Sequence, residues 1–437
     1  MCPAANSDGD RTSTQTANAL SPCGVAIPER TCLYNLPVRI LLLNLYFPPD
    51  TSATAKMASL LASAIAERHQ VTVLCGRPSY DPQERRPRKL WQTEQLGKVR
   101  VIRVGSTDYP RFAMKRRVLN YLTYVALAVP RSLFLSCDVV LSMTDPPFEG
   151  IVGAFIALLK HRPFVYNVCD LYPDMAVGGS IVEPGLLSRV WEKLHRWALR
   201  RAAKVLVLGE DMKARIARKG VLTAKIEVLR TGAEAPSPSA SCGVDANVVR
   251  TIRGDFRFVL LHAGNLGFYG AWQTLIAGAR ELASEGVGLV FVGDGAQRRV
   301  LEAAAEGASN VRFLDFFPSS KIPSVLAAPD AHVITIKRGL EGVVVPSKMY
   351  GILAAGKPIV AVAPEETDVV AIGRQHGFSV GADPDSPAQF VAVVRELLAD
   401  PRRLEAMAQA GRSAALGYDR KAELQKLVRL LEDAGQA

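Results

Sequence analysis

The residue types best suited to chemistry are concentrated between positions 341 and 362. Glu341 precedes a Val-Val-Val-Pro-Ser-Lys run, so a carboxylate, the Ser347 hydroxyl and the Lys348 ammonium lie within a few residues of one another. Ser347 is typical of the start of a helix and Gly356 of its end. Unpaired helix N–H groups beside a hydroxyl and an ammonium can bind an anion, most readily a phosphate or diphosphate. A capped surface helix that binds nothing accounts for the same residues equally well.

Further polar loops directly follow apolar runs that predict buried parallel strands. Because the carboxyl ends of parallel strands meet at one edge of a sheet, where ligands bind, we expect these loops to lie together. Aspartates beside prolines also occur as plain turn formers, and a lysine early in a helix is as compatible with a solvated face. The candidates in the first half of the chain are Pro49, Asp50, Thr51, Ser52, Lys56, Asp145 and Asp170.

The elements that must position these residues repeat in both halves of the chain. Strand patterns alternate with helix patterns on either side of residues 233–248, which are rich in Ala, Ser, Pro and Gly. This alternation predicts an α/β fold with two Rossmann-like parallel-sheet domains, residues 37–232 and 249–437, that face each other across a cleft. We expect 233–248 to be the linker, 1–36 to be a disordered leader, and the last helix to pack back on the first domain.

Charge and cysteine usage restrict the partners and the compartment. Lys and Arg number 53 against 42 Asp and Glu, a formal net charge of +11, which suits an anionic partner. The sequence has no zinc-type Cys/His cluster and no aromatic-plus-glycine RNA signature, so nucleic acid is disfavoured. Seven cysteines without a C-x-x-C pair argue for a reducing compartment, here the cytoplasm, and against a disulfide framework or a metal site.

Residues 111–135 combine a basic start with an apolar run. Lys115, Arg116 and Arg117 precede the run, which is too short and too interrupted to span a bilayer. Such a helix suits the inner surface of the cytoplasmic membrane, and a second basic helix is predicted over 191–201. A core helix flanked by solvated arginines is the alternative.

The chain resembles the GT-B glycosyltransferases, specifically the retaining group commonly numbered family 4. Within that group it is similar to bacterial enzymes that add sugars during O-antigen, capsule or exopolysaccharide assembly, in the subgroup with a Pro-Ser-Lys pattern. The resemblance covers about residues 38–430, with five motifs in the family's order and spacing. They are Tyr46-Phe47-Pro48-Pro49-Asp50, Asp170-Leu171-Tyr172-Pro173-Asp174, Gly264-Asn265-Leu266-Gly267, Gly293-Asp294-Gly295 and residues 345–358.

The resemblance implies an acceptor-binding first domain and a donor-binding second domain, with a sugar passing from a nucleotide-sugar, a UDP-sugar, to a glycan carried on a lipid diphosphate. It implies no cofactor and no metal, and the chain has no Asp-x-Asp motif where a metal-dependent transferase would need one. Asp50 and Asp145 with their neighbours would lie on the acceptor side. On the donor side, the diphosphate would contact Gly264, Asn265, Gly267, Ser347 and Lys348, the nucleoside Gly293, Asp294 and Gly295, and the base Phe317 and Pro318.

Departures from the family pattern change which residues are expected to contact the donor. A glutamate pair carried by many members is replaced by Val343 and Gly351, and Glu341, two residues early, is expected to contact the sugar hydroxyls. The basic residues that often follow the glycine loop are also missing. Lys348 is therefore the clearest cation left for the phosphates.

Cys169 stands where family members often carry a histidine, which leaves Asp170 as the polar residue expected nearest the anomeric carbon. Asp170, Lys348 and Glu341 are thus the predicted catalytic residues. Two other readings stay open: a non-catalytic nucleotide-sugar-binding or scaffold protein, and an enzyme of the UDP-sugar 2-epimerase type. A nicotinamide dehydrogenase is poorly supported, because no G-x-G-x-x-G follows the first strand.

Overall fold

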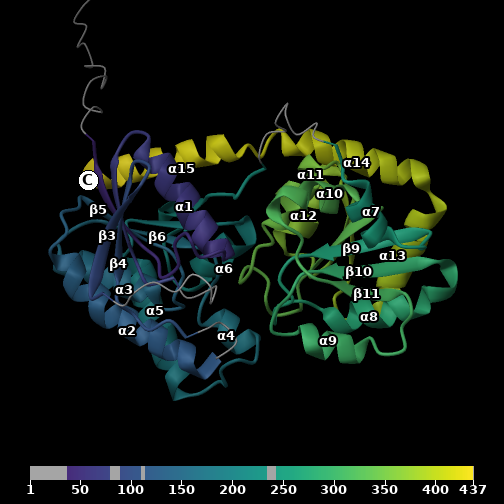
Figure 1. The fold of residues 1–437 in the computed structure, drawn as a ribbon, viewed down its shortest axis with the longest axis horizontal. Coiled ribbons are helices and arrows are strands. Elements are labelled where there is room, and N and C mark those ends of the chain that lie inside the picture. Colours follow the sequence, from purple (N-terminus) through teal and green to yellow (C-terminus); the bar gives the residue numbers. More distant parts are fainter. Residues whose placement is uncertain (1–36, 79–88, 110–113, 234–242, 437) are drawn as a thin grey trace, which may run out of the picture. The chain divides into compact units, whose positions relative to one another are not determined.

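The computed structural model describes residues 37–78, 89–109, 114–233 and 243–436 (Figure 1), and residues 37–437 form one compact unit. The predicted leader, 1–36, lies outside the described residues, as do 234–242 of the predicted linker. Residues 246–248, which sequence analysis placed in the linker, instead begin a helix. Asp245 caps that helix through the N–H of Asn247, and Val248 is buried on its inner side.

The first half is built on an eight-stranded sheet with the order β3-β4-β2-β1-β5-β6-β7-β8. All neighbouring strands are parallel except β3 and β4. Its strands are β1 (Arg39–Leu43), β2 (Gln70–Cys75), β3 (Trp91–Leu96), β4 (Val99–Val104), β5 (Val139–Ser142), β6 (Phe164–Val168), β7 (Lys204–Val207) and β8 (Ile226–Val228). Sequence analysis missed β3, because this antiparallel edge strand is mostly exposed and lacks an apolar run.

Helices cover both faces of this sheet (Figure 1). One face packs against α1 (Ala53–Ala66) and α15 (Arg420–Gln436), so the last helix joins the core of the first half. The side chain of Glu432 on α15 contacts His69 at 3.0 Å. The other face carries α2 (Met114–Leu133), α3 (Glu149–Leu159) and α5 (Leu186–Arg201), with the shorter α4 (Asp174–Gly178) and α6 (Glu210–Arg218) nearby.

The second half has a six-stranded, all-parallel sheet with the order β11-β10-β9-β12-β13-β14. This is the strand order of the doubly wound dinucleotide-binding fold, whose switch point lies between β9 and β12. Its strands are β9 (Phe258–Ala263), β10 (Val287–Val292), β11 (Val311–Leu314), β12 (Ala331–Thr335), β13 (Ile359–Val362) and β14 (Ser379–Ala382). The α/β, two-sheet prediction is therefore confirmed.

The helices of the second half follow its strands in alternation. Sequence analysis did not identify α12 or α14, which follow the last predicted motif. The helices are α7 (Ala246–Arg253), α8 (Trp272–Glu281), α9 (Arg298–Ala304), α10 (Ile322–Ala327), α11 (Lys348–Ala354), α12 (Asp368–His376), α13 (Pro387–Ala399) and α14 (Pro401–Ala415).

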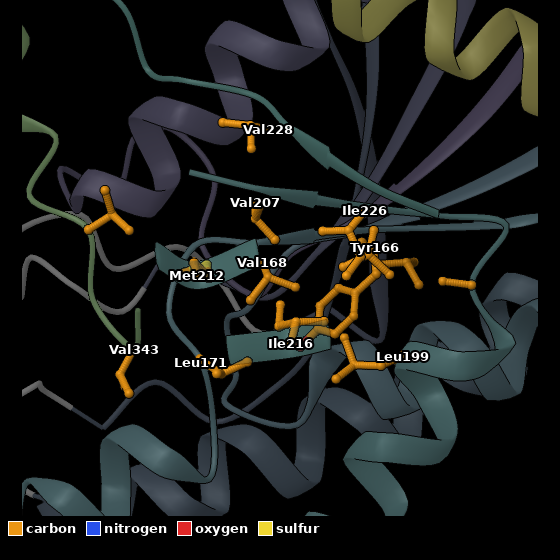
Figure 2. Packing of buried hydrophobic residues seen from close by; sticks show 14 of the residues in the cluster. Tyr166, Val168, Leu171, Leu199, Val207, Met212, Ile216, Ile226, Val228 and Val343 are labelled. Atoms are coloured by element: carbon orange, nitrogen blue, oxygen red, sulfur yellow. The ribbon is translucent and has the colours of Figure 1, made fainter. Parts of the chain in front are cut away.

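One buried cluster includes residues from both halves of the chain. Figure 2 shows part of it, from Tyr166 and Val168 to Leu171 and Val343. The N–H of Leu171 donates to the Val343 carbonyl at 3.0 Å, so the loop after β6 is fixed against the loop before α11. The polar loops predicted from sequence to carry chemistry are thereby held in contact.

Candidate active site

Two glycine loops pack on each other at the carboxyl ends of β9 and β10. The N–H of Leu266 donates to the Asp294 carbonyl at 3.0 Å. Gly264 and Gly293 have φ angles of 142° and 146°, and a Cβ on Gly293 would lie 2.0 Å from the Gly264 carbonyl oxygen. A Cβ on Gly295 would lie 2.4 Å from the Leu266 carbonyl oxygen. Side chains are excluded here, which leaves a backbone surface that a phosphate can approach.

Two aromatic side chains that sequence analysis missed hold the first loop in place. The Tyr269 hydroxyl donates to the Asn265 carbonyl, and the Trp272 Nε1–H donates to the Gly267 carbonyl at 2.7 Å. Tyr269 stands in the segment 268–270, where basic residues were expected after the glycine loop, and Trp272 is the first residue of α8. These two side chains thus stabilise the backbone of the first glycine loop.

Lys348, the first residue of α11, brings its amine to the first glycine loop. Its Nζ lies 3.0 Å from Nε2 and 3.4 Å from Nδ1 of His262, and 3.4 Å from where a Cβ on Gly264 would stand. Burial lowers the pKa of Lys348 to about 7. The neighbouring Ser347 is exposed and its side chain makes no capping hydrogen bond. The structure brings Lys348 to the glycine loop, as expected from sequence, and adds His262.

Asp170, after β6, lies beside the same loops. It forms an isolated antiparallel bridge with Val344. Burial, and then the charge of Asp145, raise the pKa of Asp170 to about 7. Burial and then the Asp170 carboxylate raise the pKa of Tyr269, which places this carboxyl group near the first glycine loop. Asp170, from the first half of the chain, thus lies close to residues of the second half.

Glu341 is engaged by its own loop. Its Oε1 accepts the Gly339 N–H at 2.7 Å, and its backbone carbonyl accepts from Arg215 NH1 at 2.9 Å. Arg215 also donates to Asp174 at 3.0 Å. These bonds anchor the loop before α11 to the first half of the chain. Contact of Glu341 with a sugar stays a prediction and requires its carboxylate to exchange the Gly339 N–H for a sugar hydroxyl.

Asp145, which was predicted for the acceptor side, follows β5 and interacts with Thr54 and Arg117. Burial raises its pKa, while a hydrogen bond with Thr54 and the charge of Arg117 lower it. Arg117 donates to the Tyr46 hydroxyl at 3.1 Å. Arg117 therefore points into the fold, and contact of residues 111–135 with a membrane stays a prediction.

The other predicted acceptor-side residues divide into structural and exposed ones. The Ser52 hydroxyl accepts the Ala55 N–H at 3.0 Å and so caps α1, which accounts for this serine without a ligand. Asp50 is buried and Pro49 is half-buried, whereas Thr51 and Lys56 are exposed. Lys56 on α1 has the solvated position that sequence analysis left open.

The loop after β11 contains two adjacent phenylalanines whose side chains point in different directions. Phe317 packs partly buried in the core around α7 and α10, whereas Phe316 is 55% exposed. A Cβ on Gly293 would lie 3.2 Å from the Phe316 ring, so this ring stands beside the second glycine loop. Arg298 donates to the Gly293 carbonyl at 3.0 Å. Phe316 is thus the exposed ring at this loop, Phe317 turns into the core, and Pro318 next to them is exposed. Contact of Phe317 and Pro318 with a base stays a prediction.

The described residues contain neither a metal-binding cluster nor a membrane-spanning helix. No group of three or more His, Cys, Asp or Glu side chains in this part of the chain could hold a metal ion. Among the same residues, no helix combines the length and the apolar character needed to cross a bilayer.

Known families and proteins match both halves of the chain. Residues 52–232 match the glycosyl transferase 4-like domain, and residues 252–414 match the glycosyl transferases group 1. The probable glycosyltransferase WbjE of Pseudomonas aeruginosa is 24% identical over 60% of this chain. WcaI of Escherichia coli (strain K12), a glycosyl transferase provisionally assigned to colanic acid biosynthesis, is 25% identical over 56% of it. The matches cover 66% and 63% of these relatives, just under two thirds of their own length.

A solved structure shows the same fold. HepE from Anabaena, crystallised in complex with UDP and glucose, superposes with a TM-score of 0.65 and 18% identity. The superposition covers 91% of this chain and all of HepE. The chain is therefore a two-domain protein of the GT-B fold, with a glycosyl transferase 4-like domain followed by a glycosyl transferases group 1 domain.

Proposed function

We propose that the protein is a retaining glycosyltransferase that moves a hexosyl or N-acetylhexosaminyl group from a UDP-sugar to a lipid-diphosphate-linked glycan in cell-surface polysaccharide synthesis. One observation carries the proposal: the Lys348 Nζ stands under a glycine loop from which side chains are excluded. The provisional role of WcaI in colanic acid biosynthesis and the UDP bound by HepE support the substrate classes.

In this mechanism the bond between the anomeric carbon and the diphosphate breaks as the acceptor hydroxyl approaches the same face of the sugar. The proton of the acceptor hydroxyl passes to the departing phosphate. Because the acceptor attacks directly, no protein nucleophile is required. Negative charge grows on the diphosphate, where the Lys348 ammonium and the N–H groups of the glycine loop stabilise it. The Asp170 carboxylate, in its ionised form, stabilises the positive charge that develops at the anomeric carbon.

The test is donor turnover with a panel of UDP-, GDP- and dTDP-sugars, with release of the free nucleotide as the readout and a lipid-extract acceptor included. We expect release from a UDP-sugar, and an α-linked product from an α-linked donor by NMR. Binding of a donor without turnover under all conditions would favour a scaffold role. Failure of every donor to bind would overturn the transferase proposal.

Phe316 is expected to stack on the uracil ring of the donor. Because stacking of a base on an aromatic ring is worth about 1–3 kcal/mol, Phe316→Ala should raise the donor KM about 5- to 150-fold with little change in kcat. The matched control is Phe317→Ala, which removes a core contact and should lower the melting temperature instead. Equal KM values for Phe316→Ala and the parent enzyme would exclude a stacking role.

The acceptor's lipid requires a membrane, and the first half offers a surface for one. The helix α3 contacts both α2 and α5, and all three expose large apolar side chains. On α5, Arg189, Lys193, Arg196, Arg200 and Arg201 are exposed as well, which suits an anionic leaflet. We name this surface the three-helix face. Its exposed apolar residues include Val118, Leu119 and Leu122 of α2, Phe155, Leu158 and Leu159 of α3, and Leu186, Leu187, Val190, Leu194 and Trp197 of α5.

Leu186 and Leu187, 79% and 74% exposed, are the best site at which to test this face. We expect the double change Leu186→Glu and Leu187→Glu to release the protein from vesicles of anionic phospholipid in a sedimentation assay, because it replaces apolar contacts with repelling charge. Leu416→Glu is the control, since Leu416 is 81% exposed after α14, away from the three-helix face. Unchanged sedimentation of the double variant would contradict a membrane role for this face.

A further inference from the structure

The contact between Lys348 and His262 is unusual in its charge balance. Two nitrogen groups lie 3.0 Å apart, and no carboxylate in the described part of the chain forms a hydrogen bond or ion pair with Lys348. A close N–H···N contact needs a lone pair on one partner, so the ammonium and the imidazolium forms cannot both be present. The pair therefore holds at most one positive charge.

The surroundings of His262 keep its ring uncharged. The side chain is fully buried between Trp272 and Phe291, with ring centroids 4.8 Å and 6.1 Å away. Burial, and then the charge of Lys348, hold the pKa of His262 well below its ordinary value. His332, on the neighbouring β12, is the other titratable group that acts on the pair, and burial lowers its pKa to about 4. Both histidines are thus neutral near pH 7.

Lys348 is left as the group that changes charge. The Lys348 side chain is partly buried, and its one hydrogen-bond partner among the described residues is the neutral imidazole of His262. Burial lowers the pKa of Lys348 to about 7, so the uncharged amine is favoured above pH 7. A diphosphate placed against the Gly264 loop would bring negative charge to within a few Å of this nitrogen. That charge favours the ammonium form strongly.

We propose that His262 and Lys348 form a proton-accepting pair, which is uncharged in the empty site and takes up one proton from solvent when the nucleotide diphosphate binds. This inference rests on the proposed function and deepens it. His262 is the positioning residue: its ring nitrogen accepts an N–H of the amine and keeps Nζ beneath the glycine loop before the diphosphate arrives. Free enzyme, nucleotide and one proton give the charged complex.

Proton uptake links affinity to pH in a defined direction. Above pH 7 the proton must be drawn from a solution that holds fewer of them, so affinity should fall by up to tenfold for each unit of pH. Below about pH 6 the lysine is already charged and this dependence should disappear. An exposed lysine with its ordinary pKa of about 10.4 would instead give flat affinity up to about pH 9.

The experiment is calorimetric titration of the full chain with UDP at pH 8, in Tris and in HEPES. The two buffers differ in ionisation enthalpy, so the difference in observed heat counts the protons exchanged. At pH 8 the terminal phosphate of UDP, with a second pKa of about 6, is already ionised and does not contribute. We expect close to one proton taken up per UDP, and affinity that falls from pH 7.5 to pH 8.5.

Variants separate the two members of the pair. Lys348→Met should abolish the proton uptake. His262→Leu should weaken UDP binding about tenfold, because it leaves the amine without a partner, and His262→Gln should restore affinity through its amide oxygen. Melting temperatures confirm that each variant is folded, and the titration of the parent protein needs no variant at all.

The outcomes are distinct. Binding of UDP without proton uptake at pH 8, or uptake that survives Lys348→Met, would overturn the inference and leave the glycosyltransferase proposal standing. Failure of UDP and of every donor in the panel to bind would overturn both.

Discussion

Replacing Lys348 with methionine is expected to lower kcat about 10²–10³-fold, the loss seen when one preorganised donor to a developing negative charge is removed. The melting temperature should stay level or rise. A buried amine costs free energy of desolvation, and methionine fills a similar volume without a polar group. Loss of activity together with unchanged or greater stability is the signature of a residue that serves the reaction.

Lys357→Met provides the matched control. Lys357 follows the carboxyl end of α11, at whose other end Lys348 stands, and burial lowers its pKa as well. Its Nζ donates to the Pro329 carbonyl at 2.9 Å, away from the glycine loops. We expect this variant to keep the parent's kcat. Equal activity of Lys348→Met and Lys357→Met would show that the diphosphate does not depend on Lys348.

Asp170→Asn is expected to lower kcat about 10²-fold or more, because an amide cannot offset the positive charge that develops at the anomeric carbon. In the parent enzyme kcat should rise as pH increases through about 7, where Asp170 ionises, and in the variant this rise should vanish. The measurement is a pH–rate profile from pH 5.5 to 9 with saturating donor. If kcat still rose with pH in Asp170→Asn, the rise would have to come from the ionisation of another group.

The same substitution has a predicted effect on stability, with a definite sign. The pKa of Asp170 is about 7 in the folded protein and about 3.9 in an unfolded chain, so the folded state binds the proton more tightly. Stability from this group is greatest below pH 4 and is lost as pH rises through 7. Asp170→Asn should therefore melt higher than the parent at pH 8, and the two should converge near pH 4.

Asp174→Asn, on the same loop, is expected to change the melting temperature in the opposite direction. Burial alone would raise the pKa of Asp174, but the charges of Lys219, at 2.6 Å, and Arg215, at 3.0 Å, hold it below its ordinary value. Its stabilising effect is present above pH 4 and is lost in acid. Asp174→Asn should therefore melt lower than the parent at pH 8. If both aspartate variants shifted the melting temperature in one direction, the assignment of Asp170 as a strained functional group would be wrong.

Asp170 and Lys348 thus share one property. Each is an ionisable group whose burial opposes its charged form. Asp170 also meets Val344 and Tyr269 of the other half of the chain. Such groups are common at catalytic sites because charge held ready in a desolvated position acts strongly on a substrate. Their cost to stability is offset by apolar packing such as the cluster around Leu171 and Val343 (Figure 2).

Much of the fold could be predicted from the local pattern of apolar and turn-forming residues. The apolar runs that became β1, β6 and β9 are short, continuous and bounded by turn residues, and buried parallel strands need no partner to be recognised. The glycine loops were equally visible, since Gly264 and Gly293 stand directly after such strands and only glycine adopts their φ angles without strain. These features depend on neighbours in sequence, which the sequence displays.

What the tertiary structure decided is which way side chains point and which distant residues they meet. Arg117 reads as membrane-facing beside an apolar helix, yet contact with Tyr46 turns it inward. Phe316 and Phe317 are adjacent and chemically identical, and only the core around α7 and α10 determines which ring is exposed. Such choices follow from long-range packing and from the desolvation of charge, and neither leaves a local signature in sequence.

The pair of His262 and Lys348 is the clearest case. The sequence by itself determined a histidine at the end of a buried strand and a lysine at the start of a helix 86 residues later. Only the strand order of the second sheet places β9 beside β12, and so brings the loop after β12 over the end of β9. The histidine and the lysine acquire their chemistry there. Burial, with no carboxylate partner among the residues that the structure describes, makes the lysine's charge depend on what binds.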